Sequence, residues 1–433
     1  MKLASFFSDG VILQQGKPVA VWGEGEGEVR LTIDGVTVTA RCADGRFIAE
    51  LPQHEVGGPY TLVAQCGGET VEVKDVYYGE VFIASGQSNI AFVLTQLYQP
   101  LDECRQTVRM FTYERPWSMM NNPARDMRWL AIAEENKDAV SAVASHFAIE
   151  LANTLGVPVG IVCNAQGASN IQTWMSPEAV EAEAEVFKQH DLDEVYDDCY
   201  VFNARSYLYN NSLRMLAPYT ARGVIWYQGE GNTEGATTPV YERLFSAFLK
   251  GWRALWNDDD MPMITVQIAP FYPGAERARW EVIQEHQLNA YLHEKNIGLV
   301  TTGDIGNRTD VHPTEKKVLG KRLARYALGM LYGYDILYRP PVCTGAELDG
   351  STAVLSFCDT GEGLHETRHN NFVVLDKDGN IFEAEYSIEG DKVRVWADGV
   401  VPSEVRLGYC RYGELYLYSS ADLPVSPFRV EVK

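Results

Sequence analysis

Long apolar runs are missing from this sequence, and none approaches the ~20 residues that a membrane-spanning helix needs. Basic residues are also scarce, because 37 Lys and Arg face 59 Asp and Glu, for a formal net charge of -22. A surface of this sign repels phosphate backbones and anionic lipids. Neither nucleic acid nor a membrane is therefore expected as a partner, whereas the charge places no such limit on a neutral small molecule.

Closely spaced cysteine pairs are absent as well. The eight cysteines include no CxxC pair, which argues against a zinc knuckle or a redox motif and favours separate reduced thiols over a disulfide framework. The first seven residues hold one lysine and no long apolar stretch, unlike a secretory signal peptide. We therefore expect a cytoplasmic protein, or a secreted one if a signal peptide has been removed. These features leave the oligomeric state open.

The residue pattern changes twice along the 433 residues, which are enough for two or three domains. Residues 1–77 contain short β-branched runs separated by Gly-containing turns, which predicts a small antiparallel β-sandwich. Residues 78–335 alternate apolar strands with helical patterns. Over residues 336–433 the helical periodicity disappears and short strand patterns return, including one at 414–418, which predicts a second β-rich domain.

The middle region predicts a parallel sheet with helices on both faces. Continuously apolar runs are expected to form its strands, at 81–84, 159–162, 223–227, 263–268 and 297–301. Helices are expected between them, at 138–155, 240–256 and 277–295. The expected fold class is therefore α/β, a three-layer α/β/α core flanked by N- and C-terminal β-sandwich-like regions. Ligand sites in such sheets lie beyond the carboxyl ends of the strands.

Ser88 stands in a SGQSN segment (85–89) directly after the first of these strands. A serine at a strand-to-loop turn exposes its hydroxyl, and neighbouring backbone N–H groups can bind an oxyanion. Gly86, two residues earlier, lets the chain turn tightly. The pattern favours Ser88 as a nucleophile, although an ordinary turn serine also fits a Gly-x-Ser triplet.

His312 stands in a DVHP segment (310–313), late in the α/β region, and a basic helix through Lys316 and Lys317 follows it. A serine nucleophile needs a base with a pKa near ~6.5, which is that of histidine. A nearby acid such as Asp310 would fix the imidazole tautomer and stabilise its cation. The alternative is a histidine on a surface loop.

Two further polar loops follow predicted strands, at 164–169 (NAQGAS) and 228–232 (QGEGN). If the strands are parallel, both loops lie at the same sheet edge as Ser88. Small and amide residues there suit an oxyanion hole made of a backbone N–H and a side-chain NH2 group. Gly-rich loops without a catalytic role are the alternative.

With these segments in place, the chain resembles the sialate O-acetylesterase family of the SGNH hydrolases over nearly its whole length. The resemblance rests on six segments in order: 6–14, 79–89, 208–210, 223–232, 304–313 and 423–429. It implies an SGNH-hydrolase (flavodoxin-like) core and a serine esterase that hydrolyses O-acetyl esters on carbohydrates. It further implies that Ser88 is the nucleophile, that His312 is the base, and that Gly167 and Gln228 help the Ser88 amide to hold the oxyanion.

The chain departs from the family pattern at three positions. The family usually has methionine where Ile90 stands and serine where Gly231 stands, and neither position transfers a proton. Many SGNH hydrolases place Asp three residues before the histidine, where this chain has Thr309. Asp310 stands only two before, so either Asp310 or a backbone carbonyl is expected to orient His312.

The expected reaction is a two-step acyl transfer through an acetyl-serine, which requires no metal and no organic cofactor. The expected partner is an acetylated mono-, oligo- or polysaccharide, either a sialic acid or a plant glycan such as xylan.

The aromatic candidates for stacking on a sugar ring are Trp174, Trp226, Tyr227 and Trp280, although core packing is the commoner role of such residues. The predicted substrate-binding residues are Gln87, Asn89, Glu230, Asn232, Trp226 and Arg308, the last for a sialate carboxylate. The alternative function is an inactive carbohydrate-binding protein with an esterase-like core.

Overall fold

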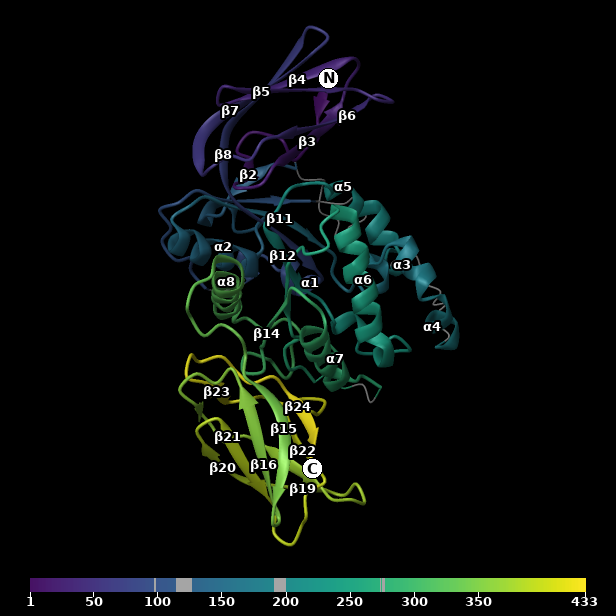
Figure 1. Ribbon diagram of the computed structural model, residues 1–433, viewed down its shortest axis with the longest axis vertical. Helices are drawn as coiled ribbons and strands as arrows, with labels where there is room; N and C mark the ends of the chain where they lie inside the picture. Colours follow the sequence, from purple (N-terminus) through teal and green to yellow (C-terminus); the bar gives the residue numbers. More distant parts are fainter. Residues whose placement is uncertain (97–98, 114–126, 191–199, 273, 275–276) are drawn as a thin grey trace.

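The computed structural model describes residues 1–96, 99–113, 127–190, 200–272, 274 and 277–433. Figure 1 shows three regions stacked along the long axis, with β-rich regions at the two ends and helices gathered around a sheet in the middle. This is the predicted fold class, a mixed α/β core with a parallel sheet between antiparallel β regions, and the prediction is confirmed.

The central sheet has the strand order β10-β9-β11-β8-β12-β13-β14. Its strands are parallel except at one edge, where β10 pairs antiparallel with β9. Their bounds are β8 Glu69–Gly86, β9 Val108–Thr112, β10 Trp129–Ala131, β11 Val159–Ala165, β12 Gly223–Tyr227, β13 Met263–Val266 and β14 Ile297–Val300. The edge strands β9 and β10 were not among the predicted strands, because they are short and lack a continuous apolar run.

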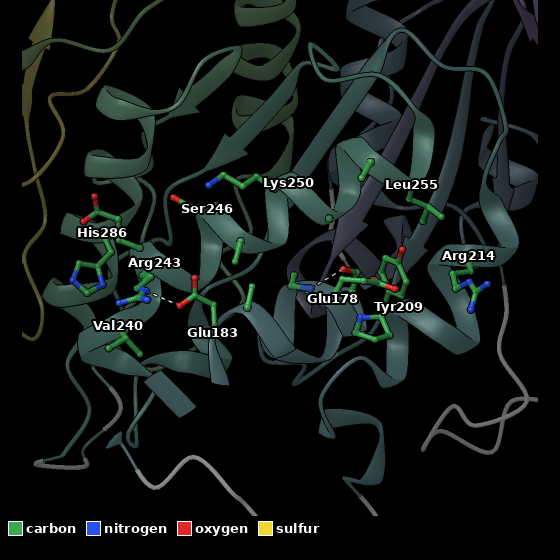
Figure 2. A pocket seen from close by; sticks show the side chains of 18 of the residues that line it. Glu178, Glu183, Tyr209, Arg214, Val240, Arg243, Ser246, Lys250, Leu255 and His286 are labelled. Atoms are coloured by element: carbon green, nitrogen blue, oxygen red, sulfur yellow. Dashed lines mark hydrogen bonds and ion pairs between the residues drawn. The ribbon is translucent and has the colours of Figure 1, made fainter. Parts of the chain in front are cut away.

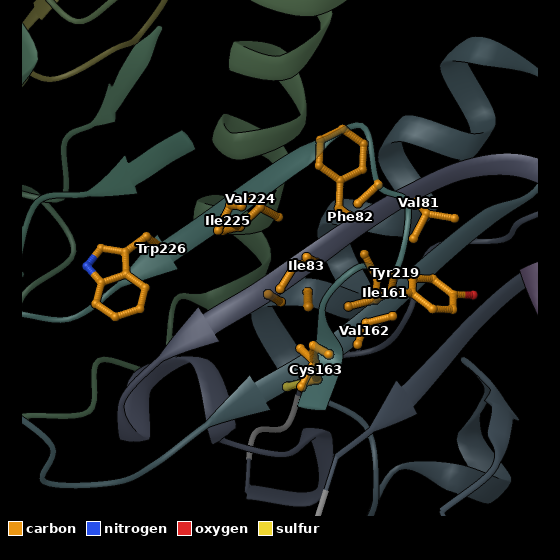
Figure 3. Packing of buried hydrophobic residues seen from close by; sticks show 14 of the residues in the cluster. Val81, Phe82, Ile83, Ile161, Val162, Cys163, Tyr219, Val224, Ile225 and Trp226 are labelled. Carbon is orange, nitrogen blue, oxygen red and sulfur yellow. The ribbon is translucent and has the colours of Figure 1, made fainter. Parts of the chain in front are cut away.

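The sheet is buried on both faces, which explains the continuous apolar runs. Phe82 on β8 packs edge-on against Phe147 at 4.9 Å, on the face covered by α2 (Ala142–Leu155) and α8 (Lys316–Tyr332). Trp226 on β12 packs at 4.5 Å against Phe248 of α6 (Tyr241–Trp256), on the other face, which α7 (Trp280–His293) also covers. Figure 3 shows the buried side chains of the middle strands, with Phe82 and Trp226 among them.

Two helices on the same face approach each other closely. A Cβ on Gly320 of α8 would lie 2.6 Å from the Cβ of His146 on α2, so glycine is required at this crossing. The helix α2 begins four residues later than 138, because Ser141 caps it by accepting a hydrogen bond from the Ala144 N–H at 3.3 Å. The shorter helices are α1 Ser88–Ala91, α3 Pro177–Ala182, α4 Ala184–Gln189 and α5 Arg214–Leu216. Among the described helices, none is long and apolar enough to cross a membrane.

The strand register decides where the polar loops meet. In the sheet, Gly86 at the end of β8 lies beside Ala165 of β11 on one side and beside Tyr227 of β12 on the other. The loops that follow these three residues therefore leave the sheet at one edge, as the parallel arrangement predicts.

Short strands form the N-terminal region, in two groups that pack as layers (Figure 1). Their bounds are β1 Lys2–Leu3, β2 Ile12–Gln14, β3 Val19–Glu24, β4 Glu28–Ile33, β5 Val36–Arg41, β6 Arg46–Leu51 and β7 Gly57–Cys66. Strand β8 pairs with β7 in this region and then continues into the central sheet, so it runs across the predicted boundary at residue 77. The domain limits at 77 and 335 stay predictions.

The C-terminal region consists of antiparallel strands. They are β15 Val342–Asp349, β16 Thr352–Cys358, β17 Leu364–Glu366, β18 Phe372–Leu375, β19 Ile381–Glu383, β20 Glu385–Glu389, β21 Lys392–Trp396, β22 Glu404–Leu407, β23 Leu417–Ser419 and β24 Phe428–Glu431. The strand expected at 414–418 begins only at Leu417, because the Leu415 N–H instead donates to the Gly303 carbonyl of the central region at 3.0 Å. This contact brings the C-terminal region against the segment that leads to His312.

Candidate active site

Ser88 is placed by the sharp exit of the chain from β8. Gly86 has φ +134°, and a Cβ there would lie 2.1 Å from the Tyr227 carbonyl oxygen, so no side chain fits. The chain turns at Gln87, and Ser88 becomes the first residue of the four-residue helix α1. The turn leaves Ser88 half-buried at the sheet edge, with its hydroxyl directed at the loop that follows β14.

His312 comes from that loop and meets Ser88 directly. The distance from His312 Nε2 to Ser88 Oγ is 2.8 Å, a hydrogen bond that lets the imidazole take the hydroxyl proton. The Phe92 ring stacks on the imidazole, with centroids 5.2 Å apart and planes inclined by 22°. Burial lowers the pKa of His312 below its usual value, the Asp310 carboxylate opposes this shift, and the Lys316 ammonium adds to it.

Asp310 lies on the other side of the imidazole. Its Oδ1 accepts the backbone N–H of His312 at 2.8 Å and lies 3.4 Å from His312 Nδ1. The Asp310 side chain is 55% exposed, so this contact is weaker than one in a dry interior. Thr309, at the position where many SGNH hydrolases carry the acid, is bonded instead to Asn307 through both its N–H and its hydroxyl.

Gly167 lies beside the nucleophile. A Cβ built on Gly167 would lie 3.6 Å from the Ser88 Cβ, so the 166–168 loop passes beside the serine. Within the described residues, no hydrogen-bond acceptor is found for the backbone N–H of Ser88 or of Gly167. These two donors are therefore available to a negative oxygen formed next to Ser88.

The side-chain amide of Gln228 is hydrogen-bonded to residues other than Ser88. It is fully buried, its Nε2 donates to the Ser169 carbonyl at 3.1 Å and to Asn232 Oδ1 at 2.8 Å, and its Oε1 accepts from the Tyr241 hydroxyl at 3.0 Å. Asn232 is equally buried, and its Nδ2 donates to Gln172 and to Thr237. In this structure both amides serve the fold and present no free amide proton to Ser88, which differs from the predicted oxyanion and substrate contacts.

The side-chain carbonyl oxygen of Gln87 also binds the protein itself, because it accepts backbone N–H groups. Its Oε1 accepts the N–H of Gly229 at 3.4 Å and of Gly231 at 3.2 Å, which ties the Ser88 turn to the loop after β12. Gly231 fits against the 166–170 loop so closely that a Cβ would lie 2.4 Å from the Ser169 carbonyl oxygen. This contact accounts for glycine at a position where the family pattern has serine.

Asn89 and Glu230 are joined beneath the nucleophile. Asn89 Nδ2 donates to Glu230 Oε1 at 2.6 Å and to the Val311 carbonyl at 3.1 Å, and Asn89 Oδ1 accepts from Lys316 Nζ. Burial raises the pKa of Glu230 and lowers the pKa of Lys316 to about 7. Lys316 is 1% exposed and was not among the residues predicted for the site. Its position three residues after Pro313, in the first turn of a helix that starts at the site, is the signal that it faces inward.

The four aromatic candidates are core residues. Trp174, Trp226, Tyr227 and Trp280 are each at most 3% exposed. Trp226, the one also predicted to bind substrate, is enclosed by Trp174, Phe248 and Trp252. It has no face to offer a sugar ring, because its strand is covered by α6 on that side.

Arg308 is exposed and lies near the site. Its guanidinium carbon is 5.1 Å from the ring centre of Tyr272 and 5.2 Å from that of Tyr412, which comes from the C-terminal region. Arg308 stands four positions before His312, so their Cα atoms are at most about 14 Å apart. The arrangement offers one cation and two tyrosine rings beside the catalytic loop.

A large groove lies elsewhere on the molecule. It has a volume of about 1140 Å³ and is lined by residues of α3 and α6, with His286 of α7 at its rim (Figure 2). Neither Ser88 nor His312 lines it. In the part of the chain that the structure describes, no group of three or more His, Cys, Asp or Glu side chains is arranged to hold a metal ion.

Comparisons with known proteins identify the family of this chain. Residues 78–329 match the family model described as "Carbohydrate esterase, sialic acid-specific acetylesterase". The chain is 24% identical to the sialate O-acetylesterase of Homo sapiens, over 99% of this chain and 92% of that protein, and 24% identical to that of Mus musculus, over 82% and 78%. It is also similar to the crystal structure of a carbohydrate acetylesterase from Xanthomonas citri, with a TM-score of 0.88 and 32% identity over 99% of both chains. The chain therefore belongs to the sialic acid-specific acetylesterase family of carbohydrate esterases and is a carboxylic ester hydrolase.

Proposed function

We propose that this protein is a serine esterase that removes O-acetyl groups from carbohydrates, with Ser88 as nucleophile, His312 as base and Asp310 as the acid that orients His312. The observation that supports this most directly is the 2.8 Å hydrogen bond between Ser88 Oγ and His312 Nε2. Asp310 Oδ1, at 3.4 Å from Nδ1, favours the tautomer with its proton on Nδ1, which leaves Nε2 free to accept.

In the first step, His312 Nε2 takes the Ser88 proton while Oγ forms a bond to the acetyl carbonyl carbon. The carbonyl oxygen becomes negative, and the N–H groups of Ser88 and Gly167 donate to it. When the tetrahedral intermediate collapses, the bond to the sugar oxygen breaks, and that oxygen leaves with the proton from His312. The acetyl group is then attached to Ser88.

In the second step, water replaces the sugar. His312 takes one proton from water as its oxygen attacks the acetyl carbon, the same two N–H groups hold the new oxyanion, and the Ser88–acetyl bond breaks. The proton returns to Ser88 Oγ, and acetic acid is released, which loses the second proton of the water to solvent and becomes acetate. Both transfers to and from Ser88 Oγ pass through His312 Nε2, so the reaction balances with water as the co-reactant.

The substrate class is an acetylated carbohydrate, either a sialic acid or a plant glycan such as xylan. Arg308 supports a substrate with a carboxylate, since a guanidinium pairs with carboxylates in a bidentate manner.

The test is acetate release from p-nitrophenyl acetate and from a panel of acetylated sialic acids, xylan and mannan. We expect Ser88→Ala to lose about 10³-fold or more of kcat, whereas Ser246→Ala, a serine in the α3–α6 groove, keeps wild-type activity. Activity that survives Ser88→Ala, or its absence from the wild type together with binding to the glycans, would favour the inactive carbohydrate-binding protein instead.

A further inference from the structure

Lys316, the first residue of α8, is buried to 1% exposure although it is a charged side chain. Its Nζ donates to Asn89 Oδ1 and lies 5.6 Å from the ring centre of Phe92 and 5.5 Å from that of Tyr227. An amide oxygen and two aromatic faces are what a buried ammonium group needs in place of water. Burying a cation costs desolvation free energy, so the residues that contact Lys316 indicate what the buried charge does.

The opposite charge belongs to the Glu230 carboxylate, which is linked to Lys316 through the side chain of Asn89. Asn89 stands between the two residues, because its Oδ1 accepts from Lys316 and its Nδ2 donates to Glu230 Oε1 at 2.6 Å. Glu230 Oε2 is buried, and no hydrogen-bond partner for it is found among the described residues. A buried carboxylate with one unpaired oxygen is stabilised chiefly by a nearby cation, so the charge states of Glu230 and Lys316 depend on each other.

This Lys316–Asn89–Glu230 cluster touches both halves of the catalytic pair. Asn89 follows Ser88 in the chain, and its Nδ2 also donates to the carbonyl of Val311, the residue before His312, at 3.1 Å. One amide side chain therefore links the turn that carries the nucleophile to the loop that carries the base. Neither loop is part of a strand or a long helix, so this link restricts how far Ser88 and His312 can separate.

The charge of the cluster also reaches His312. Lys316 and His312 both contact the Phe92 ring, at 5.6 Å from the ammonium and 5.2 Å from the imidazole centre to the ring centre, so the two cations are within about 11 Å when His312 is protonated. A like charge at this distance disfavours the imidazolium form. Asp310 from the same loop acts in the opposite sense, Glu230 faces Lys316, and Ser88 contributes no charge.

We propose that Lys316, Asn89 and Glu230 are positioning residues for the esterase reaction, which hold the Ser88 turn and the His312 loop together and whose ammonium charge keeps His312 in the neutral form that accepts a proton. This inference rests on the proposed function of Ser88 and His312. The cluster transfers no proton to substrate and acts through the catalytic pair.

The experiment is the pH profile of kcat/KM for p-nitrophenyl acetate in the wild type and in Lys316→Met, which keeps the side-chain length and removes the charge. The pKa of Lys316 is about 7, so the ammonium is charged over the acid limb, where His312 titrates. We expect the acid limb of Lys316→Met to move to higher pH by about half to one unit, and kcat to fall by about 10-fold. Lys321→Met, on the exposed side of the same helix, is the control and leaves the limb in place.

Removing one charge of a buried pair can prevent folding, so the double variant Lys316→Met/Glu230→Gln is measured alongside. Its glutamine still accepts from Asn89, and no buried charge is left uncompensated. We expect it to fold and to show the same displaced acid limb. An acid limb at the wild-type pH in the double variant would overturn the proposal. Ser88→Ala tests the proposed function separately, since it abolishes turnover whether or not Lys316 affects His312.

Discussion

Two regions of this protein contain a serine, a histidine, an acid and an arginine, yet in only one of them is the serine hydrogen-bonded to the histidine. At the carboxyl edge of the sheet, Ser88 and His312 are 2.8 Å apart and Asp310 adjoins the imidazole. The α3–α6 groove, with a volume of about 1140 Å³, is lined by Ser246, His286, Glu183 and Arg243 (Figure 2).

The two regions differ in which of these side chains are hydrogen-bonded to one another. Within the described residues, no hydrogen bond joins Ser246, His286 and Glu183, and Glu183 instead accepts from Arg243 at 2.6 Å. A hydroxyl becomes a nucleophile only when a base is within hydrogen-bond reach. A groove of large volume and a suitable set of residues therefore do not make a catalytic site unless the side chains are in these contacts.

The largest expected difference is between the two histidines. His312→Ala should lower kcat by about 10³-fold, because His312 is the base that the described residues place on the Ser88 hydroxyl. His286→Ala should leave kcat within about two-fold, because burial lowers the pKa of His286 but no nucleophile adjoins it. Steady-state hydrolysis of p-nitrophenyl acetate measures both, and equal losses would remove the distinction between the two regions.

A smaller difference is expected between the two acids. Asp310→Asn should lower kcat by about 10- to 100-fold, because the exposed carboxylate at 3.4 Å stabilises the imidazolium less than a buried acid would. Since Asp310 raises the pKa of His312, the variant's acid limb should lie at lower pH than that of the wild type. Glu183→Gln is the matched control. A wild-type pH profile in Asp310→Asn would favour a backbone carbonyl as the group that orients His312.

The smallest expected effect separates the two arginines and depends on the substrate. Arg308→Gln should lower kcat/KM for acetylated sialic acid by about 5- to 10-fold, if the guanidinium pairs with its carboxylate, and leave p-nitrophenyl acetate unchanged. Arg243→Gln should affect neither substrate. An Arg308→Gln variant with unchanged kcat/KM on sialic acid and on the neutral glycans would remove Arg308 from the binding surface.

The strands of the central sheet could be predicted because a strand buried on both faces appears in the sequence as a continuous apolar run. The apolar run at 223–227 is strand β12 with the same limits, and the runs at 159–162 and 297–301 lie at β11 and β14. Ser88 and His312 could be predicted for a related reason, since each stands where a buried element ends and polar residues begin. No local pattern joins the two residues, which are 224 positions apart, and only the resemblance to the family implied that they meet; the structure places them at 2.8 Å.

Side-chain partners could not be predicted in this way. Gln228 was an attractive oxyanion donor because it follows β12, but its amide protons are used by Ser169 and Asn232. Trp226 was a plausible sugar-stacking residue until the covering helix α6 placed it in the core. Lys316 stood in a basic run typical of a solvated helix face, yet it points inward to Asn89. In each case the outcome depends on an element distant in sequence.

The sequence by itself determined the α/β core and its β-rich flanks and indicated Ser88 and His312, which the structure brings together, because burial period and turn chemistry are local properties of the chain. Only the tertiary structure decided which amides are free, which aromatic rings are covered and which lysine is buried. These depend on the register of β8 between β11 and β12, which brings three loops to one edge, and on the direction in which α8 leaves that edge. Hydrogen-bond partners and burial are set by such long-range contacts, and no spacing within the chain encodes them directly.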